Sequence, residues 1–145
     1  MTGWLLDTNV LSAFAPDKPP ITPETAAWFR ERTDALFLST VTVAEIEAGI
    51  AKLRRSGARR RAGDLRGWFD RIVTLYGDRI LAFDLAAARI AGALSDAATA
   101  DGHHPGFADV AIAAIARAQQ LVVVTGNLRH FDALGVETWN PLEPS

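Results

Sequence analysis

The segment Trp4-Leu5-Leu6-Asp7-Thr8-Asn9 joins a short apolar run to one acidic and two polar residues. An apolar run of this length predicts a buried strand, which we place at residues 3–6, with Asp7 at its end. The β-branched run Leu121 to Val124 is typical of a central parallel strand, and the turn Thr125-Gly126-Asn127 follows it. Because sites in parallel sheets gather beyond the carboxyl ends of the strands, we expect Asp7 and this turn to share one pocket.

The rest of the chain alternates between strand and helix patterns. Further strands are predicted at residues 35–39, 79–83 and 136–139. Helices are predicted at residues 8–15, 23–32, 41–53, 58–75, 85–100, 107–118 and 128–134, with a tail from residue 141 to residue 145. This alternation predicts one α/β domain over residues 1–145, built around a mostly parallel sheet.

The composition excludes several classes of protein. With 145 residues and 49% apolar side chains, the chain suits a single domain with a sizeable core. It contains no cysteine, which excludes disulfides, thiolate zinc sites and cysteine nucleophiles. The first residues lack a basic signal-peptide region, and no apolar run approaches the roughly 20 residues of a membrane span. We therefore expect a soluble, cytoplasmic protein with no membrane segment.

Three acidic residues lie within apolar stretches that would otherwise be buried. Asp7 ends the first strand, Glu45 lies on the predicted helix 41–53, and Asp109 is in the first turn of the helix 107–118. A buried carboxylate is unfavourable unless it is paired, hydrogen-bonded or bound to a cation. One shared cation would account for all three, although each residue alone is also explained as a helix cap or a surface group. Carboxylate oxygens suit Mg²⁺ or Mn²⁺ better than zinc.

A carboxylate site of this kind has a direct use in the hydrolysis of phosphodiesters. A divalent ion polarises the phosphate group and lowers the pKa of a bound water molecule, which can then attack the phosphorus in line. No side-chain nucleophile is required. The sequence therefore indicates a metal-dependent phosphodiester hydrolase.

Motifs along nearly the whole chain occur in the order typical of one family. They are the stretches 5–12 (Leu-Leu-Asp-Thr-Asn-Val-Leu-Ser), 39–50, 79–84, 108–114 (Ala-Asp-Val-Ala-Ile-Ala-Ala) and 124–131, followed by 134–136 and 140–141. With these motifs the chain resembles PIN-domain ribonucleases of the VapC type, the toxin halves of bacterial toxin–antitoxin pairs. It especially resembles the branch related to FitB.

The resemblance implies a three-layer α/β/α fold and a type II toxin that is a Mg²⁺-dependent endoribonuclease. It implies that Asp7, Glu45 and Asp109 are the catalytic residues and the metal ligands, with Thr8 and Thr125 supporting the site by hydrogen bonding. It also implies a homodimer, a cognate VapB-type antitoxin, and a structured RNA substrate such as tRNA or rRNA. Operator DNA would be contacted only through the antitoxin.

Two further polar residues belong to the same region, and the chain departs from the family pattern there. Asn9 is expected to hold the loop around Asp7, and Asn127 to support the site. Relatives often carry Thr-Arg-Asp or Thr-Arg-Asn where this chain has Thr125-Gly126-Asn127, so we expect weaker binding of a second metal. His130 stands where many relatives have aspartate. Asp132 either compensates for it or is a surface charge, and we favour the surface charge.

Other chemically reactive residues receive structural interpretations. Asp84 precedes the helix 85–100 and is predicted to be its N-cap. His103 and His104 lie in a loop and are left out of the catalytic set. Glu47 is expected to point away from Glu45 and to be solvated. Core or dimer packing is expected for the tryptophans Trp4, Trp28, Trp68 and Trp139.

A short segment concentrates positive charge in a chain whose net charge is −2. Its cationic residues are Lys52, Arg54, Arg55, Arg59, Arg60, Arg61 and Arg66. Two interpretations stay open. The segment is a solvated helix end and turn, or it contacts RNA phosphates or an acidic partner. The residues named for such contact are Arg54, Arg55, Arg59, Arg60 and Arg61.

Two other functions compete with the endoribonuclease. One is a weakly active or inactive toxin-like subunit that acts with its antitoxin as a DNA-operator-binding repressor, which the departures at Gly126 and Asn127 favour. The other is a phosphatase of the haloacid-dehalogenase type. That class needs a second aspartate two residues after the first, and Asn9 occupies this place.

Overall fold

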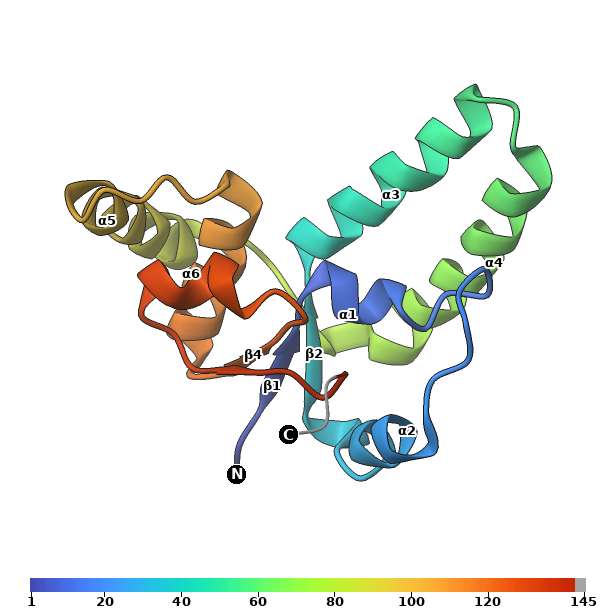
Figure 1. The fold of residues 1–145 in the computed structure, drawn as a ribbon, viewed down its shortest axis with the longest axis horizontal. Helices are drawn as coiled ribbons and strands as arrows, with labels where there is room; N and C mark the ends of the chain where they lie inside the picture. Colours follow the sequence, from blue (N-terminus) through green and yellow to red (C-terminus); the bar gives the residue numbers. More distant parts are fainter. Residues whose placement is uncertain (143–145) are drawn as a thin grey trace.

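The centre of the protein is a parallel sheet of five strands in the order β3-β2-β1-β4-β5. A computed structural model describes residues 1–142, so the last three residues of the expected tail lie outside the described part (Figure 1). The strands are β1 (Trp4–Leu6), β2 (Leu36–Ser39), β3 (Ile80–Leu81), β4 (Val122–Val124) and β5 (Thr138–Trp139). Every pairing is parallel, and Leu5 lies between Phe37 of β2 and Val123 of β4. The predicted mostly parallel α/β sheet is confirmed.

The helices connect the strands as the alternation predicted. The α-helices are α1 (Thr8–Ser12), α2 (Pro23–Arg30), α3 (Thr40–Arg55), α4 (Arg59–Tyr76), α5 (Leu85–Ala100) and α6 (Phe107–Gln119). The 3₁₀ turns are η1 (Thr33–Ala35), η2 (Gly77–Arg79) and η3 (Leu128–Leu134). None of the helices in residues 1–142 has the length and hydropathy that crossing a membrane requires.

Some predicted bounds were wrong, and the reasons are local. The first helix stops at Ser12 rather than residue 15, whereas the short helix predicted at 128–134 is confirmed and is of the 3₁₀ type. The strands predicted at 79–83 and 136–139 contain two residues each. Both are edge strands with a single neighbour, and natural sheets commonly keep such edges short.

Alternate side chains of the strands face two separate apolar layers, as the pleat of a strand requires. Leu5 and Val123 pack with α5, α6 and η3 on one face of the sheet. Leu6 and Val124 pack with α1, α2, α3 and α4 on the other. Figure 1 shows α5 and α6 on one side of the strands and α3 and α4 on the other. The three-layer α/β/α arrangement is therefore confirmed.

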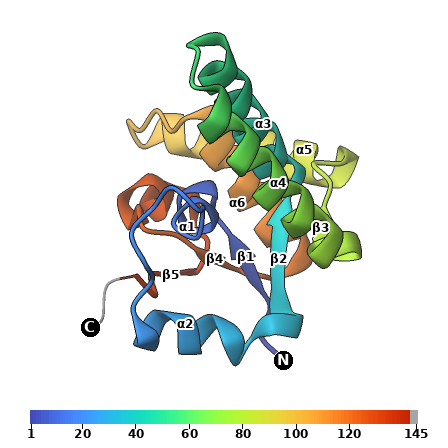
Figure 2. The ribbon, with the colours of Figure 1, turned by 90° about the vertical axis from the view of Figure 1, so that its right-hand side faces the viewer.

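Helices α3 and α4 form a hairpin that extends beyond the sheet (Figures 1 and 2). The chain reverses at Gly57, whose φ of +92° is a conformation that favours glycine. Arg66 of α4 donates hydrogen bonds to both carboxylate oxygens of Glu47 on α3 and to Asp70. Glu47 is thus half-exposed but paired, so its predicted solvated state was only partly right, because the fold brings α4 alongside α3.

The tryptophans mostly serve packing. Trp4 and Trp28 meet edge to face with ring centroids 5.0 Å apart, and the guanidinium of Arg32 lies 4.3 Å from the centroid of Trp28. Trp68 packs in the core on the α1–α4 face. Trp139 is 43% exposed, so its predicted core or dimer role stays a prediction.

Asp84 is the N-cap of α5, as the sequence predicted: its Oδ1 accepts a hydrogen bond of 3.0 Å from the backbone N–H of Ala87. We expect Asp84→Ala to lower the free energy of unfolding by about 1 kcal/mol, because the first turn of α5 loses a hydrogen-bond acceptor. Urea denaturation measures the change. Asp84→Ser retains a capping oxygen and serves as the matched control. Equal stability of the Ala and Ser variants would contradict the capping role.

Candidate active site

Asp7 lies at the junction of β1 and α1, beside the end of β4. Its backbone N–H donates to the carbonyl of Val124, which joins the two strand ends. The side chain is only 6% exposed and both carboxylate oxygens are occupied. Oδ1 accepts from the backbone N–H of Thr8 at 2.9 Å, and Oδ2 accepts from the hydroxyl of Thr125 at 2.9 Å. The predicted proximity of Asp7 to the turn after β4 is confirmed.

Glu45 reaches this region through the hydroxyl of Thr8. Thr8 Oγ1 donates to Glu45 Oε1 at 2.6 Å and lies 2.9 Å from the hydroxyl oxygen of Thr42. Because Thr8 has one hydroxyl proton and gives it to Glu45, Thr42 must donate to Thr8. Thr42 is fully buried, and its backbone N–H donates to Ser39, the N-cap of α3. The start of α3 therefore orients Thr8 and, through it, Glu45.

Asp109 enters from α6 and is paired with a histidine. His130 of η3 places its Nδ1 3.3 Å from Oδ2 of Asp109. The sequence singled out His130 only as a departure from the family pattern and did not predict this contact. Ser39 and Thr42 were also missed, although a serine directly before a helical pattern is a readable N-cap signal.

Burial and neighbouring charge raise the pKa values of Asp7 and Asp109. Burial raises the pKa of Asp7, the hydrogen bonds from Thr125 and Thr8 lower it, and the charges of Asp109 and Glu45 raise it further. Burial also raises the pKa of Asp109, the nearby His130 lowers it, and the charge of Glu45 raises it. The charge of Glu45 thus acts on both Asp7 and Asp109, although the three residues come from separate elements.

The donor set suits a hard divalent cation in its chemistry. Three carboxylates and two hydroxyls offer oxygen ligands, and their shared negative potential is what a divalent ion neutralises. Within residues 1–142, no group of three acidic or histidine side chains is already gathered closely enough to hold an ion directly. Each carboxylate instead has a partner within the protein: Thr125 for Asp7, Thr8 for Glu45 and His130 for Asp109.

The loop after β4 is tied to this pocket by the asparagine that the sequence assigned to it. Asn9 Oδ1 accepts from the backbone N–H of Gly126 at 3.3 Å, and the N–H of Asn127 donates to Thr125 Oγ1 at 2.9 Å. The side chain of Asn127 is exposed. A Cβ on Gly126 would meet its nearest atom, in Leu142, at 3.7 Å, so nothing in the packing requires glycine there. Asp132 is exposed, in keeping with a surface charge.

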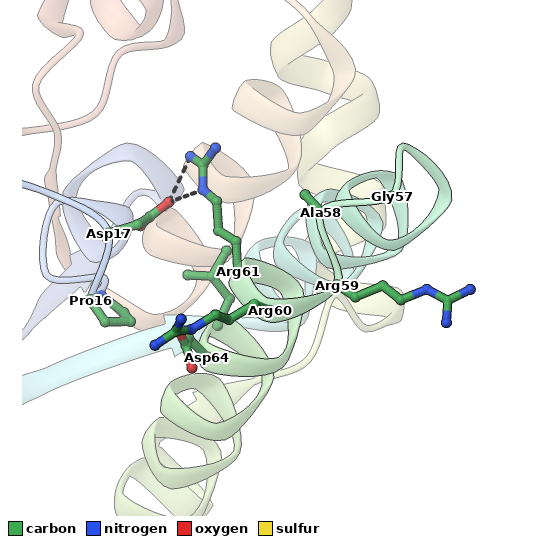
Figure 3. Close-up of a pocket in the computed structure, with 9 residues that line it drawn as sticks. Pro16, Asp17, Gly57, Ala58, Arg59, Arg60, Arg61 and Asp64 are labelled. Atoms are coloured by element: carbon green, nitrogen blue, oxygen red, sulfur yellow. Dashed lines mark hydrogen bonds and ion pairs between the residues drawn. The ribbon is translucent and has the colours of Figure 1, made fainter.

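The arginines that the sequence analysis named for RNA or partner contact surround the turn of the α3–α4 hairpin. Arg54, Arg55, Arg59 and Arg60 are exposed and make no ion pair within residues 1–142; we call them the arginine tip. Arg61 differs, because it donates to Asp17 through both Nε and Nη2 at 2.7 Å. Figure 3 shows Arg61 turned toward Asp17, while Arg59 extends away from it.

Two hollows connect this basic region with the acids. A hollow of about 420 Å³ lies between the turn of the hairpin and the loop after α1 (Figure 3). A groove of about 300 Å³ shares Asp17 and Arg61 with this hollow and extends to Glu45. Its lining includes Thr8, Asp17, Lys18, Glu45, Lys52 and Arg61. A charged chain lying in this groove would pass from cationic side chains to Glu45.

Comparison with known proteins assigns the family. The model of the PIN domain matches residues 4–136. The VapC ribonuclease Y4jK of Sinorhizobium fredii is 36% identical over 145 residues, covering 97% of this chain and 99% of that protein. The chain belongs to the PIN-domain family.

Solved structures agree with this assignment. The crystal structure of FitAcB from Neisseria gonorrhoeae has a TM-score of 0.84 at 32% identity, covering 97% of this chain and 99% of that chain. The crystal structure of DNA-bound VapBC from Salmonella typhimurium has a TM-score of 0.82 at 25% identity, with the same coverage. The fold is thus shared along nearly the full length of these proteins.

We expect Asp109→Asn to stabilise the metal-free protein at neutral pH. Because burial raises the pKa of Asp109, the folded state holds this proton more tightly than the unfolded chain does. Binding of this proton stabilises the folded protein fully when the pH is below the pKa of Asp109 in the unfolded chain. This stabilisation is lost as the pH rises through the pKa of Asp109 in the folded protein. Asparagine never ionises, so the Tm of the variant in EDTA should exceed that of wild type at pH 7.5. The difference should narrow toward pH 4, near the ordinary aspartate pKa of about 3.9.

Asp132→Asn is the matched control for this measurement. It removes the same charge from an exposed position close in sequence to His130 and should leave the Tm unchanged. A lower Tm of Asp109→Asn at pH 7.5, or an equal gain from Asp132→Asn, would contradict the electrostatic account of the pocket.

Proposed function

We propose that this protein is a Mg²⁺-dependent endoribonuclease and the toxin of a type II toxin–antitoxin pair, with Mn²⁺ as an alternative ion. The observation that carries the proposal is the hydrogen-bonded placement of Asp7 and Glu45 around Thr8 at the carboxyl end of a parallel sheet, with the charge of Asp109 close enough to raise the pKa of Asp7. The PIN-domain match and the relative named a VapC ribonuclease support it. The substrate would be a structured RNA, tRNA or rRNA, whose cleavage in the cytoplasm stops translation.

The roles of the residues follow from their positions. Asp7, Glu45 and Asp109 would hold the divalent ion, as PIN-domain nucleases generally use one. When bound, such an ion polarises a phosphate oxygen and makes a water molecule acidic enough to attack at neutral pH. Thr125 and Thr8 fix the oxygens of Asp7, and Thr8 also orients Glu45. Asn9 and Asn127 hold the loop after β4 in place.

We expect Asp7→Ala to reduce RNA cleavage at least about 100-fold, because loss of a metal ligand forfeits several kcal/mol of transition-state stabilisation. Expression of wild type without a partner should arrest bacterial growth, whereas Asp7→Ala should be harmless. The cleavage assay uses total bacterial RNA with Mg²⁺, with Mn²⁺ and with EDTA, and sequencing of RNA ends identifies the cut. Asp132→Ala, an exposed acid of the same type, should retain wild-type activity.

One outcome would favour the repressor instead. If wild type and Asp7→Ala are equally harmless, and neither cleaves RNA with either metal, the nuclease assignment is wrong. The departures at Gly126 and Asn127 would then mark a site that has lost its activity. DNA binding together with the antitoxin would be the function left to test.

The proposed partners follow from the relatives. The DNA-bound VapBC structure supports a VapB-type antitoxin, with operator DNA reached only through that antitoxin. We also propose a homodimer, for which the exposed apolar side chains of Leu85, Phe107 and Trp139 offer surface. The arginine tip and the groove beside Glu45 are proposed to guide RNA to the acids, since RNA binding relies on phosphate contacts from exposed cations.

Replacing Arg55 and Arg59 of the arginine tip by glutamine should weaken RNA binding and flatten its salt dependence. Each lost phosphate contact on a single strand should reduce the slope of log K against log salt by about 0.7. The measurement is fluorescence anisotropy with a labelled RNA in the Asp7→Asn background, which prevents cleavage. Arg89→Gln, an exposed arginine on α5, is the control. An unchanged slope would show that the tip is only a solvated turn.

A further inference from the structure

A second hollow has Asp109 in its lining. Its volume is about 460 Å³. The lining residues are His103, His104, Pro105, Gly106, Asp109, Arg129, His130 and Ala133, and we call this space the histidine hollow. It gathers all three histidines of the sequence, although they come from two segments separated by the whole of α6.

The charges of the histidine hollow suit an anion. Asp109 is the one carboxylate in its lining, and this carboxylate is already paired with His130. Arg129 is exposed and has no ion-pair partner within residues 1–142. His103 is held at the rim by its backbone N–H, which donates to the carbonyl of Ala98 at 2.8 Å. The hollow thus offers a guanidinium and imidazole groups, and its single carboxylate is paired with one of these imidazoles.

The histidine hollow lies where an RNA strand bound for cleavage would extend. The loop between α5 and α6 and the segment η3 lie on one side of the strand ends, and the α3–α4 hairpin lies on the other (Figure 1). The acids stand between these two sides, and Asp109 lines the histidine hollow itself. An RNA strand that enters along the groove beside Glu45 and crosses the acids would therefore extend into the hollow.

We propose that the histidine hollow binds the phosphate of the nucleotide next to the cleaved bond. This inference rests on the proposed nuclease function and names a contact of its substrate. An arginine fork matches the geometry of a phosphate, and imidazole N–H groups add donors to its oxygens. The volume of the hollow lies within the range of sites for small ligands, so it can receive one nucleotide. Phosphate contacts of this kind position RNA without selecting its sequence.

The first test measures binding without catalysis. With only three histidines in the chain, the imidazole C2–H signals of the full-length protein can be followed individually by NMR. We expect uridine 5′-monophosphate and inorganic phosphate to shift all three signals saturably, in EDTA or with Mg²⁺, and uridine to shift none. Arg129→Ala should weaken this binding about tenfold, the loss expected for one charged hydrogen-bond partner. Arg89→Ala, the matched control, should not change it.

The second test uses RNA cleavage. Loss of a contact made equally in the ground state and the transition state raises KM and leaves kcat unchanged. We therefore expect the Arg129→Ala variant to have a KM about tenfold higher and an unchanged kcat. The double variant His103→Ala/His104→Ala should show the same change. The control variant Arg89→Ala should change neither KM nor kcat.

The results separate this inference from the nuclease assignment. If the protein cleaves RNA but the histidine signals ignore both phosphate ligands, or respond equally to uridine, the phosphate site is wrong and the nuclease stands. If the signals shift and Arg129→Ala weakens the binding as expected, but wild type cleaves no RNA, the anion site stands and its assignment to a cleaved substrate falls.

Discussion

The buried hydrogen bond from Thr125 to Asp7 is the contact on which the rest of the site depends. It joins the ends of β1 and β4 and supplies a partner to a carboxylate that is almost completely removed from water. Without such a partner an ionised aspartate here would be strongly unfavourable. Within residues 1–142 no buried side-chain nitrogen or oxygen lacks a hydrogen-bond partner. The acidic pocket is thus built as a satisfied polar network whose remaining unfavourable feature is negative charge.

The same fold separates charges that nearly cancel over the whole chain. A net charge of −2 conceals an acidic centre with cationic groups on both sides. One side is the α3–α4 hairpin, and the other is the histidine hollow beside Asp109. This arrangement favours contact between an anionic polymer and the cationic groups on either side. Such contact brings the polymer's backbone toward the acidic residues. A divalent ion would reverse the sign of the potential at the centre.

Much of the site was predictable because its residues interrupt strong local patterns. Asp7, Glu45 and Asp109 stood out as charges within apolar stretches, and Thr125 stood out at the end of a β-branched strand. The capping role of Asp84 followed from its place before an alanine-rich helix. The contacts between Arg66 and Glu47, and between Arg61 and Asp17, gave no such signal, because each depends on how two distant segments pack.

The sequence alone determined the parallel α/β sheet and the positions of most helices, since these follow from periodicity, and it singled out the acidic residues as charges within apolar stretches. The tertiary structure decided which side chains pair with one another. Only packing places Thr8 between Glu45 and Thr42, and only the approach of η3 to α6 places His130 against Asp109. Side-chain pairing over distances of tens of residues depends on the relative position of whole elements, which no local pattern encodes.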